Sequence, residues 1–126
     1  MNTIFQDWAS AKPFIERALE YSKGTHTIDD VALLVGAGHF KVWIGKGCAM
    51  LTEVQLYPRM KILNVFAAGG DMKELLTLEE SLIGAAKELG CERITEIGRE
   101  GWLKVLPGAE KLGTALYRDI GKEPGP

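Results

Sequence analysis

Two glutamates lie inside apolar segments and are the first candidates for acid–base chemistry. Glu53 lies within the strand-forming segment 48–57, and Glu96 lies within the short apolar segment 92–97. An apolar setting disfavours the charged form of a carboxyl group and raises its pKa, which suits a general base. We therefore predict Glu53 and Glu96 as catalytic bases. The alternative is that both side chains lie on the solvent face of their strands.

A phenol could supply the proton donor, and Tyr57 and Tyr117 are the candidates. A phenol can protonate a leaving group when the fold holds it beside that group. Tyr117 lies in a segment, 114–120, that is expected to form the last strand of the chain. Tyr117 is therefore the predicted catalytic acid, and the alternative is that each tyrosine packs at the rim of the core.

Arg99 and Trp102 follow the end of the segment 92–97 and are separated from it by a glycine. An arginine at such a place can bind an anionic group, and a neighbouring tryptophan can form a platform for a ligand. We predict both as substrate-binding residues. The alternatives are that Arg99 pairs with Glu96 or Glu100 and that Trp102 is a packing anchor.

No metal site is expected from the spacing of the possible ligands. His26 and His39 have no partners at ligand spacing, and the chain has only two cysteines, Cys48 and Cys91, with no CxxC motif. We expect both cysteines to be reduced and buried. The sequence contains no Ser/His/Asp or Cys/His triad pattern.

The elements that must position these residues predict an α/β protein with a mixed sheet. Segments 39–44, 48–57 and 61–68 are rich in strand formers and are separated by Gly45-Lys46-Gly47 and by Pro58-Arg59, which predicts an antiparallel meander. A helix from a capping box at Thr77 to Gly90 then returns the chain to a parallel strand at 92–97. The other expected elements are an edge strand at 2–5, helices at 10–23 and 28–35 (the second capped by Thr27 and Asp30), a helical turn at 71–76, a short helix at 98–106, a last strand at 114–120 and a flexible tail at 121–126.

The bulk composition limits the classes of function. The 126 residues suit one domain, and 46% hydrophobic and 25% charged residues are typical of a soluble globular protein. A formal net charge of -2 offers no basic surface for duplex nucleic acid. We expect a cytoplasmic protein of a bacterial cell, without a signal peptide or membrane span. Formation of a homodimer through the exposed face or the edge of the meander remains an alternative.

The order of elements around Gly69-Gly70 resembles the GNAT superfamily of N-acetyltransferases. Short motifs also resemble the small GNAT-like proteins of bacteriophages and prophages. These motifs are Thr27-Ile28-Asp29-Asp30-Val31, the Trp43 strand, Thr52-Glu53-Val54, Tyr57-Pro58, Ala68-Gly69-Gly70 and Gly98-Arg99-Glu100-Gly101-Trp102. The resemblance covers about residues 10–120. It implies a fold in which a β-bulged strand and the parallel strand that follows splay apart.

The resemblance also implies acetyl-CoA as the acyl donor and a small-molecule or protein amine as the acceptor. The donor's pantetheine arm would lie along the strand that ends at the two glycines, and its pyrophosphate would lie at the start of the next helix. The implied cofactor-binding residues are Val65, Phe66, Ala67, Ala68, Gly69, Gly70 and Lys73. The two glycines either permit close approach of a ligand or simply form a tight turn.

Two functions therefore remain open. The first is direct transfer of an acetyl group to an amine, with backbone N–H groups of the bulged strand stabilising the thioester oxygen. The second is a catalytically inactive GNAT-fold phage protein that serves as a binding or virion-associated module. The second is favoured by the absence of a Gln/Arg-x-x-Gly-x-Gly loop and by the acidic residues Asp71, Glu74, Glu79 and Glu80 in its place.

Overall fold

The computed structural model describes residues 4–96, 106–113 and 115–121. The chain divides into two compact units, Met1–Glu96 and Ile97–Pro126, and every described helix and strand belongs to the first. The expected last strand at 114–120 is wrong, because residues 115–120 form no strand and Leu116 and Ile120 are exposed. The expected helix at 98–106 lies almost entirely outside the described residues.

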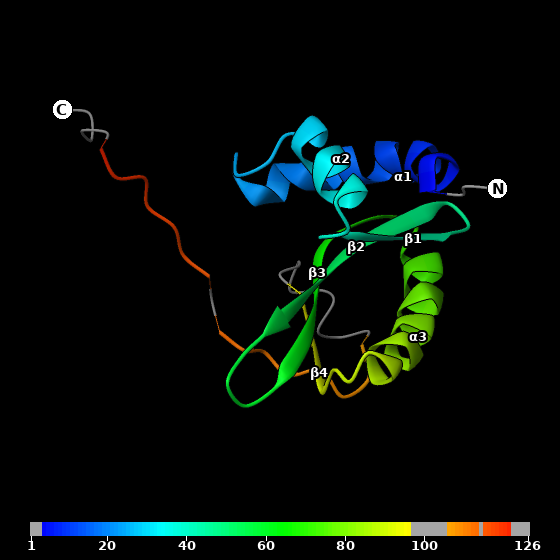
Figure 1. The fold of residues 1–126 in the computed structure, drawn as a ribbon, viewed down its shortest axis with the longest axis vertical. Coiled ribbons are helices and arrows are strands. Elements are labelled where there is room, and N and C mark those ends of the chain that lie inside the picture. Colours follow the sequence, from blue (N-terminus) through cyan, green and yellow to red (C-terminus); the bar gives the residue numbers. More distant parts are fainter. Residues whose placement is uncertain (1–3, 97–105, 114, 122–126) are drawn as a thin grey trace. The chain divides into compact units, whose positions relative to one another are not determined.

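The first unit is built on a four-stranded mixed sheet in the order β1-β2-β3-β4 (Figure 1). Strands β1 (Lys41–Gly45), β2 (Cys48–Leu56) and β3 (Lys61–Gly70) are antiparallel, and β4 (Arg93–Glu96) is parallel to β3. The predicted meander and parallel crossover are confirmed. The first hairpin is tighter than expected, because Gly45 pairs with Cys48 and leaves a two-residue turn of Lys46 and Gly47.

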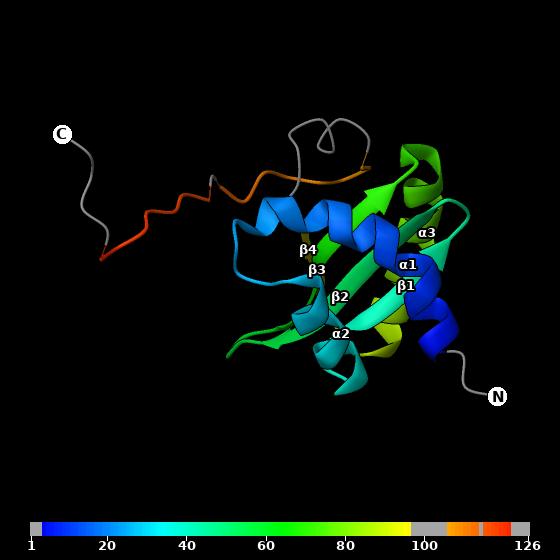
Figure 2. The ribbon, with the colours of Figure 1, turned by 90° about the horizontal axis from the view of Figure 1, so that it is seen from above.

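Helices cover the two faces of this sheet unequally (Figures 1 and 2). Helix α1 (Ile4–Ala18), the short 3₁₀ turn η1 (Leu19–Ser22) and helix α2 (Ile28–Gly36) lie over one face, and α3 (Met72–Glu88) lies under the other. We call these the α1 face and the α3 face. The buried core of the α1 face consists of Ala11, Ile15, Leu19, Val31, Phe40, Ala49, Leu51 and Ala67.

The first helix begins earlier than the sequence suggested. Ile4 and Phe5 are helical, so the expected edge strand at 2–5 is wrong where the structure describes it, and Ser10 lies inside α1 rather than capping it. Pro13 is also inside the helix, where it removes one backbone hydrogen bond. The apolar stripe that buries Ala11 and Ile15 outweighs this loss. The second helix was predicted correctly, and the Thr27–Asp30 capping box is present.

Helix α3 is continuous from Met72 and does not start at Thr77. Its N-cap is Asp71, whose carboxylate accepts a hydrogen bond from the N–H of Glu74 at 3.1 Å. Thr77 instead donates its hydroxyl to the carbonyl of Lys73 at 3.3 Å, as a threonine does inside a helix. The helical turn and the helix expected as separate elements are therefore one helix.

A buried polar pair on the α3 face gives a stability prediction. Thr52 is 1% exposed, and its hydroxyl accepts a hydrogen bond from the indole N–H of Trp43 at 2.8 Å. Thr52→Val keeps the shape of the side chain but leaves the indole N–H without a partner. We expect a loss of about 1–3 kcal/mol in the free energy of unfolding, measured by urea denaturation. Thr52→Ser keeps the acceptor, and a loss equal to that of valine would contradict this explanation.

Candidate functional site

A β-bulge interrupts β3 next to the last described residue of β4. Leu51 of β2 pairs with Ala67 and Thr52 pairs with Val65, so Phe66 is an extra residue in β3. On its other edge β3 pairs with β4 only through Ile62–Val65. Of the residues that the structure describes, none pairs with β3 beyond Val65 on this edge. Within the described residues, the backbone N–H and C=O groups of β3 beyond Val65 therefore have no strand partner on this edge, as a ligand-binding edge requires.

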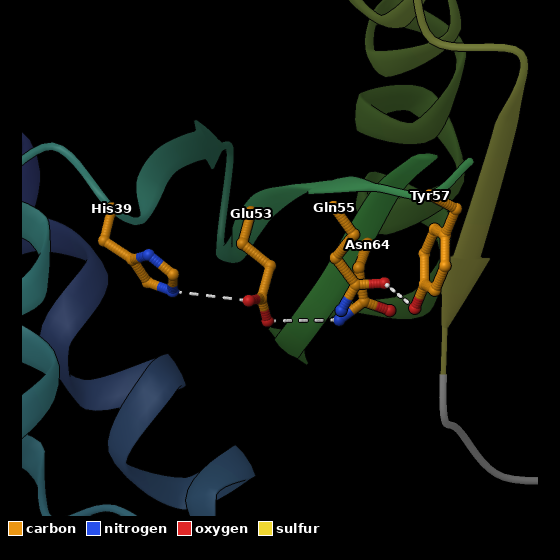
Figure 3. A network of polar contacts seen from close by, with 5 residues as sticks. All are labelled: His39, Glu53, Gln55, Tyr57 and Asn64. Carbon is orange, nitrogen blue, oxygen red and sulfur yellow. Dashed lines mark hydrogen bonds and ion pairs between the residues drawn. The ribbon is translucent and has the colours of Figure 1, made fainter. Parts of the chain in front are cut away.

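A chain of polar side chains crosses the α1 face from the loop before β1 to β4, and Figure 3 shows its members His39, Glu53 and Asn64. His39 Nε2 lies 3.3 Å from Glu53 Oε1, which is an ion pair when the ring carries a second proton. Asn64 Nδ2 donates to Glu53 Oε2 at 3.3 Å, and Thr95 Oγ1 donates to Asn64 Oδ1 at 2.8 Å. The chain therefore fixes the Glu53 carboxylate over the middle of the sheet. The Glu53 side chain is 16% exposed, so the predicted solvent-face alternative does not hold for it.

Aromatic rings lie next to this polar chain. The rings of Phe40 and Phe66 stack with centroids 4.9 Å apart, and the His26 ring meets the edge of Phe66 at 4.7 Å. Phe66 is the bulge residue, so one side chain joins the open edge of β3 to the aromatic group. No local pattern in the sequence indicates a role for His26 or His39. Their contacts come from loops that fold back onto the sheet, which local pattern does not reveal.

Glu96 lies on the opposite face of the sheet from Glu53. It pairs with Val65, the residue before the bulge, and its carboxyl group hydrogen-bonds to Glu79 of α3. Burial raises the pKa of Glu96 to about 8, and the hydrogen bond and negative charge of Glu79 add to the shift. Glu96 therefore carries a proton at neutral pH. The prediction of an apolar setting is confirmed, but a protonated carboxyl group is an acid rather than a base.

Tyr57 makes a separate contact at the end of β2. Its hydroxyl donates to Gln55 Oε1 at 3.2 Å, and its side chain is 53% exposed (Figure 3). Tyr117 belongs to the second unit, is 68% exposed and lies in no strand. Its assignment as catalytic acid stays a prediction. Arg99 and Trp102 lie outside the described residues.

The two glycines that end β3 are required by the protein's own packing. A Cβ on Gly69 would lie 2.5 Å from the carbonyl oxygen of Phe14 in α1, and one on Gly70 would lie 2.4 Å from the carbonyl oxygen of Gly47. Gly70 also has a φ of 114°, which side-chain-bearing residues rarely adopt. Close approach of backbone to backbone therefore explains both glycines without a ligand, and neither position forms a simple tight turn.

The implied donor-binding residues fit one part of acetyl-CoA better than the other. The open edge at Phe66, Ala67 and Ala68 suits an extended pantetheine arm, which bonds to backbone as another strand would. The start of α3 suits a pyrophosphate less well, because the Asp71 carboxylate already caps it and Glu74 adds a second negative charge. Lys73 is exposed in the same turn and is a cation available there.

Two further properties limit the chemistry. Among the described residues, no group of three or more His, Cys, Asp or Glu side chains is placed to hold a metal ion. In the same part of the chain, each helix falls short of the length and apolar character needed to cross a membrane.

Solved structures with the same fold include acetyltransferases. The protein TTHA1254 of Thermus thermophilus has a TM-score of 0.62 at 13% identity, with 94% of each chain covered. The aminoglycoside acetyltransferase meta-AAC0020, from an uncultured soil metagenomic sample and in complex with sisomicin, has a TM-score of 0.61 at 13% identity, over 84% of this chain and 86% of that chain. A probable acetyltransferase has a TM-score of 0.63 at 6% identity, over 89% and 90%.

The sequence itself adds no closer relative. No protein-family model matches it, and no curated protein matches it. None of the three structures above is described as a bacteriophage protein, so that narrower resemblance stays a prediction. At these identities the likeness concerns the fold alone. The chain has the fold of the GNAT-type acetyltransferases.

Proposed function

We propose that this protein transfers an acyl group from a pantetheine thioester, with acetyl-CoA as the simplest donor, to a primary amine. The observation that carries the proposal is the edge of β3 at the Phe66 bulge, which has no partner among the described residues, next to a partly buried carboxylate held by two other side chains. The thioester supplies an activated carbonyl carbon, and the open backbone N–H groups of the bulge can stabilise negative charge on its oxygen.

The α1 face would hold the amine. An amine lying over Asn64 and Phe66 has the Glu53 carboxylate within reach, directly or through one water molecule, and Glu53 takes the proton that an ammonium must lose before it can attack. Asn64 and His39 each hold one oxygen of Glu53, so the carboxylate keeps its orientation. Phe40 and Phe66 provide an apolar wall that excludes water from the reacting nitrogen.

The acceptor is proposed only as a class. The site combines a carboxylate with aromatic rings, a combination that attracts a cationic amine. The neighbour meta-AAC0020 was solved with sisomicin, an aminoglycoside. A first amine panel therefore contains benzylamine, spermidine and sisomicin. Release of free thiol from acetyl-CoA in the presence of each amine would measure turnover.

Donor binding can be tested without knowing the acceptor. Acetyl-CoA at about 100 times its dissociation constant should stabilise the protein by roughly 2.7 kcal/mol, seen as a rise in melting temperature. Asp71→Asn keeps an oxygen that can cap α3 but removes its charge. We expect this variant to bind acetyl-CoA more tightly, by roughly 0.3–1 kcal/mol at low salt.

The matched control is Glu80→Gln, which removes a negative charge from an exposed position in a later turn of α3. It should leave donor binding unchanged. If both variants bind acetyl-CoA more tightly by the same amount, the cause is a general charge effect and not a site at the start of the helix. No rise in melting temperature with millimolar acetyl-CoA would sink the acyl-transfer proposal.

A binding module without catalysis is the second candidate, and the capped start of α3 favours it. Asp71 satisfies the helix by itself, and the two glycines have an internal reason to be there. In that case the aromatic and polar cluster of the α1 face would bind a cationic ligand only. Binding of an amine from the panel, without any response to acetyl-CoA, is the result that this candidate requires.

A further inference from the structure

The glutamate pair between α3 and β4 contains a buried carboxyl oxygen whose possible partner in the described part of the protein is the other carboxyl group. Glu79 is 9% exposed, and apart from the contact with Glu96 its Oε2 atom has no hydrogen-bond partner there. Leu75 and Leu82 lie on the same side of α3, before and after Glu79, and both are buried. A buried polar atom with so few partners in such a place is uncommon in folded proteins and points to a use beyond stability.

The direction of the hydrogen bond places the shared proton on Glu96. The bond raises the pKa of Glu96 and lowers that of Glu79, while burial raises both. The two carboxyl groups therefore share a proton, and the pKa of Glu96 is the one that their contact raises.

The Glu79–Glu96 pair lies next to the β-bulge of the sheet. Glu96 is opposite Val65, and Phe66, the bulge residue, comes next in β3. Glu96 therefore lies beside the bulge, on the α3 face, whereas Glu53 lies on the α1 face. A thioester bound beside the bulge would have a base, Glu53, on one side of the sheet and a proton donor, Glu96, on the other.

We infer that Glu96, held by Glu79, is the general acid that protonates the sulfur leaving the acyl donor. This inference rests on the proposed function. The amine nitrogen bonds to the acyl carbon as the carbon–sulfur bond breaks. Glu53 takes the proton that the amine loses and releases it to solvent, the Glu96 carboxyl proton goes to the sulfur, and Glu96 regains a proton from solvent. A general acid is required because an alkyl thiolate is a poor leaving group near neutral pH.

The decisive experiment compares two donors with the wild-type protein and Glu96→Gln. Acetyl-CoA releases an alkyl thiolate that needs a proton, whereas S-acetyl-4-nitrothiophenol releases an aryl thiolate that does not. With the best amine of the panel, we expect Glu96→Gln to slow acetyl transfer from acetyl-CoA about 100-fold. The reaction of the aryl thioester should change little, and Glu80→Gln should change neither.

A second readout does not need turnover. In protein labelled with ¹³C-glutamate, one carboxyl signal should titrate near pH 8, disappear in Glu96→Gln and move to lower pH in Glu79→Gln. Coenzyme A, added as a probe with a free thiol, should move the midpoint of this signal, whereas desulfo-coenzyme A should move it less. Glu79→Gln should also shift the basic limb of the acetyl-CoA rate profile to lower pH.

The possible failures are distinguishable. Equal loss with both donors would show that Glu96 only supports the fold and would overturn the inference. Full activity of Glu96→Gln with acetyl-CoA would overturn it too. A wild-type protein inert with both donors would reject the proposed function, and the inference with it. If Glu96→Gln does not fold, the rate profile of Glu79→Gln decides, and an unchanged profile rejects the assignment.

Discussion

Raising the pH from 5 to 8.5 is expected to lower the free energy of unfolding by about 3 kcal/mol through the Glu79–Glu96 pair alone. In the unfolded chain Glu96 releases its proton near its ordinary pKa of 4.5, but in the folded protein it keeps the proton to about pH 8. The folded state therefore binds more protons across this window, and stability falls as the pH rises through it. Above about pH 8 the contribution is flat.

The magnitude follows from the pKa shift and from burial. One pKa unit corresponds to about 1.4 kcal/mol, so a shift from 4.5 to about 8 sets an upper limit of about 5 kcal/mol. Glu96 is only partly buried, which reduces the expected change. The window stops at pH 8.5 because burial also raises the pKa of the Cys48 thiol, which would add its own pH dependence at higher values.

Glu96→Gln isolates this contribution. The amide can still donate a hydrogen bond to Glu79 but does not titrate, so the variant should be more stable than wild type at pH 8.5 and nearly equal at pH 5. Urea denaturation at both pH values measures the difference. Glu80→Gln, an exposed change of the same charge on α3, should follow the wild type. Parallel pH curves for wild type and Glu96→Gln would contradict the shared proton.

Glu53→Gln is expected to lower kcat for acetyl transfer by a factor of about 10²–10⁴, because an amide cannot accept the proton of the ammonium. The amide oxygen can still accept the hydrogen bond from Asn64, so the melting temperature should stay close to that of wild type. Thiol release from acetyl-CoA with a saturating amine of the panel gives kcat. The acceptor KM should change less, since the aromatic wall is intact.

The control for this variant is Gln55→Ala, two residues further along β2 on the same face. Gln55 contacts Tyr57 and takes no part in the chain that holds Glu53 (Figure 3). Its kcat should equal that of wild type. If Glu53→Gln keeps more than half of the wild-type kcat, Glu53 is not the base, and the polar chain on the α1 face has a structural role.

The sequence was informative where local pattern decides the structure. The meander follows from strand formers interrupted by glycine and proline, and the Thr27–Asp30 capping box follows from two side chains three residues apart. The position of Glu53 and Glu96 in strands was predicted correctly, but that the two carboxyl groups lie on opposite faces of the sheet was not predicted. The β-bulge was not located either. It changes which residues share a face, and the extra residue at Phe66 has no distinct signal in the sequence.

The predicted start of α3 at Thr77 was wrong, and this error concealed the burial of Glu79. Starting α3 at Thr77 leaves Leu75 outside the helix, so Glu79 reads as an acidic residue of the first turn. With the helix starting at Met72, Leu75, Glu79 and Leu82 fall on one buried stripe. A glutamate among leucines at helical spacing was therefore the available signal for the pair with Glu96. Its partner on β4 depends on tertiary packing, which the sequence does not show.

The extra residue at Phe66 also sets the phase of everything that follows it in β3. Because of it, Ala67 and Gly69 face α1, and Gly69 meets the carbonyl of Phe14 at a point where a methyl group does not fit. Pairing β2 and β3 without the bulge, with the same residues, would place Ala68 opposite Ala49 and turn it toward that carbonyl. Loss of the bulge would thus cause a steric clash with α1, several residues away. The strand cannot lose its bulge and keep its sequence without moving a helix.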